Sequence, residues 1–180
     1  MTNQKYFFSD LDGTLINEDM LYLSVKLLLK EKPFRLLLIL FRAWRGVSWL
    51  KNEIAVHIDI TKLNFSVNKK VFDLLKQKKE EGYSCYLISG SNYQLVKSIF
   101  NQFELFDNFY GSDSYINLVG SNKLKKIMTL TPKFEYVGNS NQDIPIWEHA
   151  DIAYICNSSE KFNKRVVSLL PEHKKTIIVK

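Results

Sequence analysis

Two aspartates one residue apart, Asp10 and Asp12, follow the apolar run at residues 6–8. Residues two apart on a strand point to the same side, so both carboxylates can reach one site at the end of this strand. Neighbouring carboxylates repel each other unless a cation or a shared proton relieves them. Oxygen ligands favour Mg²⁺ where one or two carboxylates meet phosphate oxygens. Because Gly13 also permits a sharp turn, the pattern predicts a metal-dependent phosphoryl-transfer site.

Three further groups of polar residues could join this site. Ser89 follows an apolar run at 86–88, and its hydroxyl and the backbone N–H groups that begin at Gly90 can hold a phosphate oxygen. Lys123, at the start of an expected helix, would neutralise both a nucleophile and a phosphate. Asn139 and Asp143 follow an expected strand at 134–137, and their side-chain oxygens can ligate Mg²⁺ or support its ligands.

Each of these residues also has an ordinary structural interpretation. A lone D-x-D pattern is common in turns, where Asp side chains bond to nearby backbone. Ser89 could simply cap the helix that follows its strand. Lys123 stands near other lysines and could lie on a solvated face, and Asn139 could be a turn residue. The spacing within the whole chain must decide between these alternatives.

The expected elements would bring the polar groups together. Strands expected at 5–10, 83–88, 109–112, 134–137, 152–156 and 176–179 alternate with helices. This alternation predicts an α/β fold, a Rossmann-like parallel sheet with helices on both faces. In such sheets the site lies beyond the carboxyl ends of the strands, which is where the polar residues fall.

A mostly helical stretch at 15–66 interrupts this alternation, and we expect it to form a small cap over the site. The core domain is therefore predicted at 1–14 and 67–180. Within the cap, a second helix is expected at 34–45, and Ser48 is expected to cap a third. Ser66 is expected to cap the first core helix, at 67–80, with its apolar residues on one face and its lysines on the other.

The basic residues are unevenly distributed. Of 25 basic and 19 acidic residues, seven basic and one acidic lie at 24–51, which leaves 18 of each sign elsewhere. Here they alternate with Leu, Phe34, Phe41, Trp44 and Trp49, a composition typical of helices at a membrane surface. Alternatively, these apolar residues pack inside the cap and on the core. Nucleic-acid binding is not expected, since the rest of the chain is neutral and carries no such motif.

The chain is expected to lie in the cytoplasm, at the inner face of the membrane if the cap binds lipid. No signal-peptide pattern precedes Asp10, and no run of about 20 apolar residues predicts a transmembrane helix. Cys85 and Cys156 stand in apolar runs, so we expect both to be buried, reduced thiols.

The string DLDGTL at 10–15 resembles the first motif, D-x-D-x-T, of the haloacid dehalogenase (HAD) superfamily. The resemblance implies a Rossmann-like core with a small inserted helical cap of the C1 type. It also implies phosphatase activity in which Asp10 is the nucleophile and Asp12 the general acid and base. Thr14 would support the loop and belong to the substrate-binding residues.

The later groups resemble the remaining HAD motifs in order. Ser89, with Gly90, matches the second motif, and Lys123 matches the third, three residues after a glycine. The segment at 138–143 resembles the fourth, usually G-D-x-x-x-D, with Asn139 in place of the first acid and Asp143 as the second. The resemblance implies Mg²⁺ as the cofactor, with four residues as its ligands or their support: Asp10, Asp12, Asn139 and Asp143. A neutral Asn139 would be a weaker donor than the usual aspartate.

A narrower resemblance is to the HAD domain fused to bacterial UbiA-type prenyltransferases, most specifically in the block at 136–147. It implies a phosphatase acting on a polyprenyl-phosphate-sugar or another small phosphometabolite, with a membrane prenyltransferase as partner. Two other functions remain open. The chain could be a binding or regulatory module with weak catalysis, or a phosphotransferase whose acceptor is not water.

Overall fold

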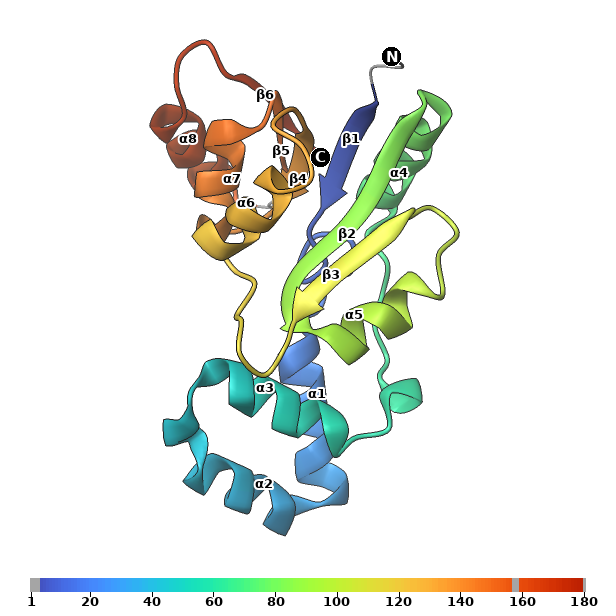
Figure 1. The fold of residues 1–180 in the computed structure, drawn as a ribbon, viewed down its shortest axis with the longest axis vertical. Helices are drawn as coiled ribbons and strands as arrows, with labels where there is room; N and C mark the ends of the chain where they lie inside the picture. Colours follow the sequence, from blue (N-terminus) through green and yellow to red (C-terminus); the bar gives the residue numbers. More distant parts are fainter. Residues whose placement is uncertain (1–3, 157–158, 180) are drawn as a thin grey trace.

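Six parallel strands form the sheet at the centre of the chain, and β1 lies between β2 and β4 (Figure 1). A computed structural model describes residues 4–156 and 159–179. The strand order is β3-β2-β1-β4-β5-β6. The strands are β1 (Lys5–Ser9), β2 (Tyr83–Asn92), β3 (Asn108–Ser112), β4 (Glu135–Gly138), β5 (Ile152–Ile155) and β6 (Lys175–Ile178). The predicted α/β fold with a parallel sheet is confirmed.

Helices cover both faces of this sheet. The core helices are α4 (Lys69–Glu80), α5 (Tyr93–Phe100), α6 (Ser121–Met128), α7 (Ile144–His149) and α8 (Glu160–Leu169). Successive residues of a strand face opposite sides. Phe7 accordingly belongs to the hydrophobic cluster that includes α4 and α5, whereas Phe8 belongs to the one that includes α6, α7 and α8. Both rings are fully buried, which explains the unbroken apolar run before Asp10.

The cap is a group of three helices beyond the carboxyl ends of the strands, at the lower end of Figure 1. They are α1 (Met20–Glu31), α2 (Pro33–Phe41) and α3 (Val47–Val56), with short 3₁₀ turns at Ala43–Arg45 and Ile60–Lys62. The helices share a small apolar cluster of their own: Leu28, Leu36, Ile39 and Ile54. Asp19 caps α1, because its carboxylate accepts a hydrogen bond from the backbone N–H of Tyr22 (2.8 Å).

Several predicted helix limits were wrong. The second cap helix ends at Phe41 rather than at 45, because the chain tightens into the 3₁₀ turn that leads to Gly46. Gly46, with a φ of 105°, takes the N-cap position of α3, so Ser48 lies inside the helix. Ser66 bonds to Glu18 instead of capping α4, and Asn68 caps that helix through the N–H of Lys70.

Two expected strand and helix features also differ. The second strand continues past the expected end at 88 to Asn92, with an irregular register against β3 between Ile88 and Asn92. Lys78 does not lie on a solvated face of α4: it is 6% exposed and pairs with Glu135 of β4. It follows Val71 by seven residues, so helical periodicity places it on the apolar face.

Cys85 and Cys156 are buried and unbridged, as predicted. Within the described residues, no helix has the length and apolar character needed to cross a membrane.

Candidate active site

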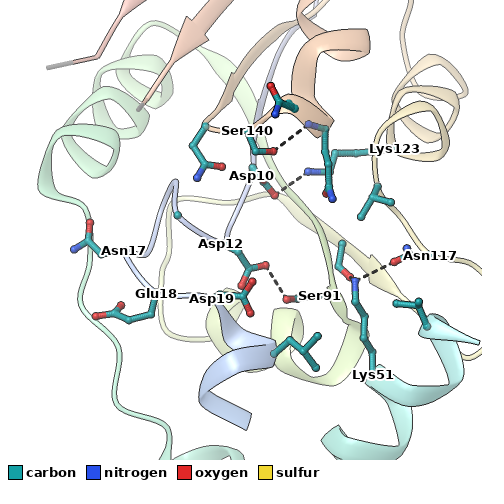
Figure 2. A pocket seen from close by; sticks show the side chains of 18 residues that line it. Asp10, Asp12, Asn17, Glu18, Asp19, Lys51, Ser91, Asn117, Lys123 and Ser140 are labelled. Atoms are coloured by element: carbon teal, nitrogen blue, oxygen red, sulfur yellow. Dashed lines mark hydrogen bonds and ion pairs between the residues drawn. The ribbon is translucent and has the colours of Figure 1, made fainter. Parts of the chain in front are cut away.

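Asp10 and Asp12 lie on the tight loop that follows β1, and both line a pocket of about 770 Å³ between the core and the cap (Figure 2). The N–H of Asp10 still continues the sheet by donating to the carbonyl of Val137 in β4 (3.0 Å). The chain then turns back, and the carbonyl of Leu11 accepts from two later N–H groups. The predicted pair of carboxylates therefore reaches one site at the carboxyl end of β1.

The Asp10 carboxylate is held by one of its two oxygens. Oδ1 accepts hydrogen bonds from the N–H of Leu11 and from Nζ of Lys123, each at 2.8 Å. Oδ2 makes no hydrogen bond to any described residue. Figure 2 shows Lys123 reaching Asp10 from the side of α6. One oxygen of Asp10 is thus fixed, and the other is available to a ligand.

Lys123 is buried in a network of three oxygen partners, as expected of a lysine that neutralises charge at the site. Its Nζ donates to Oη of Tyr136 (3.0 Å) and lies 3.6 Å from Oδ1 of Asp143. The Tyr136 hydroxyl in turn donates to Asp143 at 2.5 Å. Lys123 is 3% exposed, so this network excludes the interpretation of a solvated lysine face.

The site carries more negative than positive charge. Burial raises the pKa of the Asp10 carboxyl to about 7, the Lys123 ammonium opposes this rise, and Asp143 and Asp12 add to it. Burial acts against the Lys123 ammonium, but Asp10 and Asp143 outweigh it and raise the lysine pKa. Lys123 is therefore fully charged, whereas Asp10 holds a proton more readily than an ordinary aspartate. A cation beside Asp10 would reverse that effect.

Asp12 is oriented by three donors. Its Oδ1 accepts from the N–H of Met20 at the start of α1 (2.7 Å). Its Oδ2 accepts from the hydroxyls of Ser89 (2.9 Å) and Ser91 (2.7 Å). Burial raises the pKa of the Asp12 carboxyl, and these three hydrogen bonds oppose the rise. A carboxyl with a raised pKa and a fixed orientation is suited to giving and taking protons.

The residues predicted to bind phosphate differ in whether they reach the pocket surface. Gly90 lines the pocket together with Ser91. Ser89 is fully buried behind them. Its hydroxyl donates a hydrogen bond to Asp12 and accepts one from the N–H of Ser91 (2.9 Å). Thr14 is also fully buried, and its hydroxyl has no hydrogen-bond partner among the described residues. In this structure, Ser89 therefore acts on Asp12, and Gly90 and Ser91 form the pocket surface.

Asn139 and Asp143 occupy different positions at the end of β4. Asp143 is 1% exposed, and its Oδ2 accepts from the N–H groups of Asn139 (3.1 Å) and Ser140 (2.9 Å). Asn139 lines the pocket and packs against Gly13, where an added Cβ would stand 2.2 Å from Asn139 Nδ2. Asp143 thus supports the loop from behind, and Gly13 is needed so that Asn139 can approach.

These residues make a sparse set of metal ligands. No group of three His, Cys, Asp or Glu side chains is arranged to hold a metal ion within residues 4–156 and 159–179. The carboxylates of Asp10 and Asp12 and the amide of Asn139 are among the oxygen donors that line the pocket, to which Glu18 and Asp19 add two more carboxylates. Such a set fits Mg²⁺, which is commonly held by one or two carboxylates and completes its coordination with water and phosphate.

Three residues of the site were not predicted from the sequence. Ser91 could have been found, since it stands two residues after Ser89 at a strand end and shares its side. Tyr136 is a buried residue with a polar hydroxyl in the strand before Asn139, which is a weak signal. The residues around Lys51 in the sequence did not indicate that it belongs to the site. Its Nζ crosses from α3 to the carbonyl of Gly90 (2.7 Å), and burial lowers its pKa.

The known proteins that this chain resembles share a low sequence identity with it. No protein-family model matches the chain. The uncharacterized protein y4nM of Sinorhizobium fredii is 28% identical over 158 residues, which are 87% of this chain. The chain spans only 31% of the length of that relative.

Similar solved structures are mostly phosphatases and related hydrolases. A Bordetella pertussis protein of unknown function has a TM-score of 0.74 at 14% identity, and the match covers 99% of this chain and all of that one. An apo phosphoserine phosphatase has a TM-score of 0.65 at 15% identity, over 99% and 94%. A HAD family hydrolase of Salmonella enterica serovar Typhi has 0.63 at 15% identity, over 96% and 67%. The chain therefore has the Rossmann-like fold of the HAD-superfamily hydrolases.

Proposed function

We propose that this protein hydrolyses phosphomonoesters through a phosphoryl group carried on Asp10. The observation that carries the proposal is the contact of Asp10 with Lys123 at the pocket, while the second oxygen of Asp10 accepts no hydrogen bond from the described residues. A carboxylate held in this way can attack phosphorus with the unused oxygen. The fold of the chain supports the same reading, since phosphatases occur among the similar structures.

The reaction has two steps, and Asp12 transfers the proton in both of them. First, Oδ2 of Asp10 forms a bond to phosphorus while the ester P–O bond breaks, and Asp12 gives a proton to the departing oxygen. Then a water molecule attacks the phosphoryl group, Asp12 takes the proton of that water, and the bond to Asp10 breaks to release inorganic phosphate. The raised pKa of Asp12 supports its first role, because the carboxyl must be protonated when the leaving group departs.

Lys123 and the loop after β2 would bind the phosphoryl group. The Lys123 ammonium keeps its charge and would stabilise negative charge on the equatorial oxygens. The N–H of Gly90, which lines the pocket, would contact another oxygen, while the hydroxyls of Ser89 and Ser91 fix Asp12. Thr14 would support the loop from its buried position.

We further propose that the enzyme depends on Mg²⁺. Asp10, the backbone carbonyl of Asp12 and Asn139 would hold the ion, with Asp143 as support behind them. Burial, together with the neighbouring Asp143 and Asp12, raises the pKa of Asp10, and a cation here would offset this cost of the charged form. When bound, Mg²⁺ would neutralise charge on the phosphate oxygens.

We propose a polyprenyl-phosphate-sugar or another small phosphometabolite as substrate, and a membrane prenyltransferase as partner. The support is the resemblance of the block at 136–147 to HAD domains linked to such enzymes. Lys51 adds a cation on the cap side of the pocket, which favours a substrate with a second anionic or hydroxyl-rich group. A screen of phosphorylated compounds, with and without such a group, would test this choice.

The test of the activity itself is hydrolysis of p-nitrophenyl phosphate by the purified chain with Mg²⁺. We expect Asp10→Asn to lower kcat by about 10⁴-fold or more, because removal of the nucleophile abolishes the covalent route. Glu104→Gln, an exposed carboxylate outside the pocket, is the matched control and should keep full activity. Equal turnover by wild type and Asp10→Asn would refute the proposal.

A second candidate function is a binding or regulatory module with weak catalysis. Asn139 favours this reading, since a neutral amide stands where a carboxylate would bind the cation more strongly. Isothermal titration with Mg²⁺ and with inorganic phosphate separates the two functions. Binding of phosphate without any binding of Mg²⁺ favours the module, and binding of both favours the enzyme.

A further inference from the structure

The outer side of α2 exposes an apolar surface. Its residues recur at the spacing of one helical face and continue into the 3₁₀ turn: Phe34, Leu37, Leu38, Phe41 and Trp44. We call this surface the apolar cap face. Phe34, Phe41 and Trp44 are 81–84% exposed, and Leu37 and Leu38 are 62% and 56% exposed. Only Leu36 and Ile39 of α2 are buried in the cap. The alternative that the apolar residues pack within the cap is therefore wrong for these five side chains, whereas Leu36 and Trp49 do pack in the cap's own cluster.

The apolar cap face is separate from the pocket. Pocket-lining residues of the three cap helices and their turns are Leu21, Val47 and Lys51, which belong to α1 and α3. In Figure 1, α2 lies at the end of the molecule farthest from the sheet. A partner bound to this face would leave the described pocket residues uncovered. Monomers rarely expose a continuous patch of large apolar side chains without a binding role.

The charges around the face indicate which partner it fits. Arg42 and Arg45 alternate with Phe41 and Trp44 along the chain, and all four are exposed. The only acid at residues 24–51, Glu31, is paired with Lys62 (2.9 Å). Glu53 of α3 lines a small hollow together with Arg35 and Arg42, so two arginines there meet one carboxylate and the charge beside the apolar side chains stays positive.

Aromatic and basic side chains in this arrangement suit a lipid–water interface. Phe and Trp rings enter the boundary between headgroups and acyl chains, while Arg side chains extend their charged ends toward phosphate groups. A protein groove would also accept the apolar residues, but it would need its own acids to match the arginines. An anionic bilayer supplies both features over its whole surface.

From these observations we propose that the apolar cap face docks on the surface of an anionic lipid membrane. The chain then lies on the bilayer through α2 and the following 3₁₀ turn, without crossing it. This inference does not rest on the proposed phosphatase activity, and its test needs no turnover.

The test is co-sedimentation of the full chain with vesicles. Vesicles of phosphatidylcholine and phosphatidylglycerol should bind the chain at low salt, and vesicles of phosphatidylcholine alone should bind it less. Added salt should weaken the binding, because it screens the arginines. The absence of sedimentation with anionic vesicles at low salt would overturn the proposal.

Two paired variants separate the apolar and charged contributions. Phe41→Ser/Trp44→Ser should weaken binding by about 100-fold, since burial of each ring contributes roughly a ten-fold factor. Arg42→Gln/Arg45→Gln should weaken binding at low salt by about 25-fold, since each basic residue contributes a factor of about five. These side chains are exposed, so the variants should keep the thermal stability of the wild type.

Matched controls come from α8, which is part of the core. Val167→Ser/Leu169→Ser removes two exposed apolar residues, and Lys161→Gln/Lys164→Gln removes two exposed charges. Both controls should bind vesicles as the wild type does. Equal weakening by controls and cap variants would overturn the proposal. So would a dimer that Phe41→Ser/Trp44→Ser abolishes while vesicles fail to bind, since the face would then join two copies of the chain.

Discussion

Two buried lysine–carboxylate pairs lie at opposite ends of the sheet, and they differ in how their charge is balanced. Lys78 of α4 pairs with Glu135 at 2.9 Å, where β4 begins. Lys123 of α6 pairs with Asp10 at 2.8 Å, just past the end of β1. All four side chains are at most 10% exposed. The pairs are therefore alike in chemistry and in burial.

The pair at Glu135 has a full set of partners. Both oxygens of Glu135 accept hydrogen bonds, one from the hydroxyl of Tyr83 (2.6 Å) and one from that of Tyr154 (3.0 Å). Burial disfavours the Lys78 ammonium, but its hydrogen bonds to Glu135, Tyr154 and Glu81 outweigh burial and raise its pKa. One buried ammonium matches one buried carboxylate, so this pair holds helix and sheet together and needs no ligand.

The pair at Asp10 is left with surplus negative charge. Lys123 faces both Asp10 and Asp143, so two buried carboxylates share one ammonium. Burial raises the pKa of Asp10 to about 7 in spite of Lys123. Burial of an ion pair therefore does not by itself mark a functional site. The feature that marks a functional site here is the unmatched negative charge beside a pocket.

The largest expected difference between the pairs appears when each lysine is replaced. Lys123→Met should lower kcat by about 10³-fold, because the charge that faces the phosphoryl group is lost. Lys78→Met should instead lower the free energy of unfolding by about 3–5 kcal/mol, because it leaves Glu135 buried without a cation. Denaturant melts and phosphatase assays at matched folded fractions give both quantities.

Replacing both members of each ion pair by neutral residues tests the same difference between the two pairs. Lys78→Met/Glu135→Gln removes both charges and should recover most of the lost stability with full activity. Lys123→Met/Asp10→Asn should recover no activity. Recovery of activity in the second double variant would mean that Asp10 and Lys123 form only a structural pair.

Asp10→Asn should stabilise the protein in the absence of divalent cations, by about 4 kcal/mol above pH 7. The raised pKa means that the native state holds this proton more tightly than the unfolded chain does. Wild-type stability therefore falls as pH rises from 3.8 to about 7, whereas an amide does not titrate. The two proteins should converge near pH 4, and thermal melts across this range measure the gap. A variant less stable than wild type at every pH would contradict the charge surplus.

Asn139→Asp should produce the smallest change, an increase in Mg²⁺ affinity of about ten-fold, since a charged ligand replaces a neutral one. The extra carboxylate should also lower the stability of the cation-free protein, because it adds to the surplus around Asp10. Titration calorimetry measures the first effect. Unchanged affinity would place the cation away from Asn139.

The sequence located Asp10 and Asp12 because a parallel sheet gathers the carboxyl ends of its strands at one edge. It located Lys123 through the resemblance of its spacing after Gly120 to the third HAD motif. It did not locate Lys51, whose contact with Gly90 depends on how the cap folds back over the core. The sequence predicts that Ser66 caps α4, but a tertiary contact holds Ser66 against Glu18, and Asn68 caps the helix instead. Local patterns thus predicted the strand-end site, and contacts between distant segments decided the rest.

The most direct test of the central claim is a search for the phosphoryl group on Asp10. In Asp12→Asn, p-nitrophenolate can still leave, because it needs no proton, whereas hydrolysis of the intermediate lacks its base. We expect a burst of one p-nitrophenolate per enzyme and a phosphoryl group on the peptide that carries Asp10, detected by mass spectrometry after an acid quench. An unmodified Asp10 peptide, or a burst that persists in Asp10→Asn/Asp12→Asn, would contradict the account.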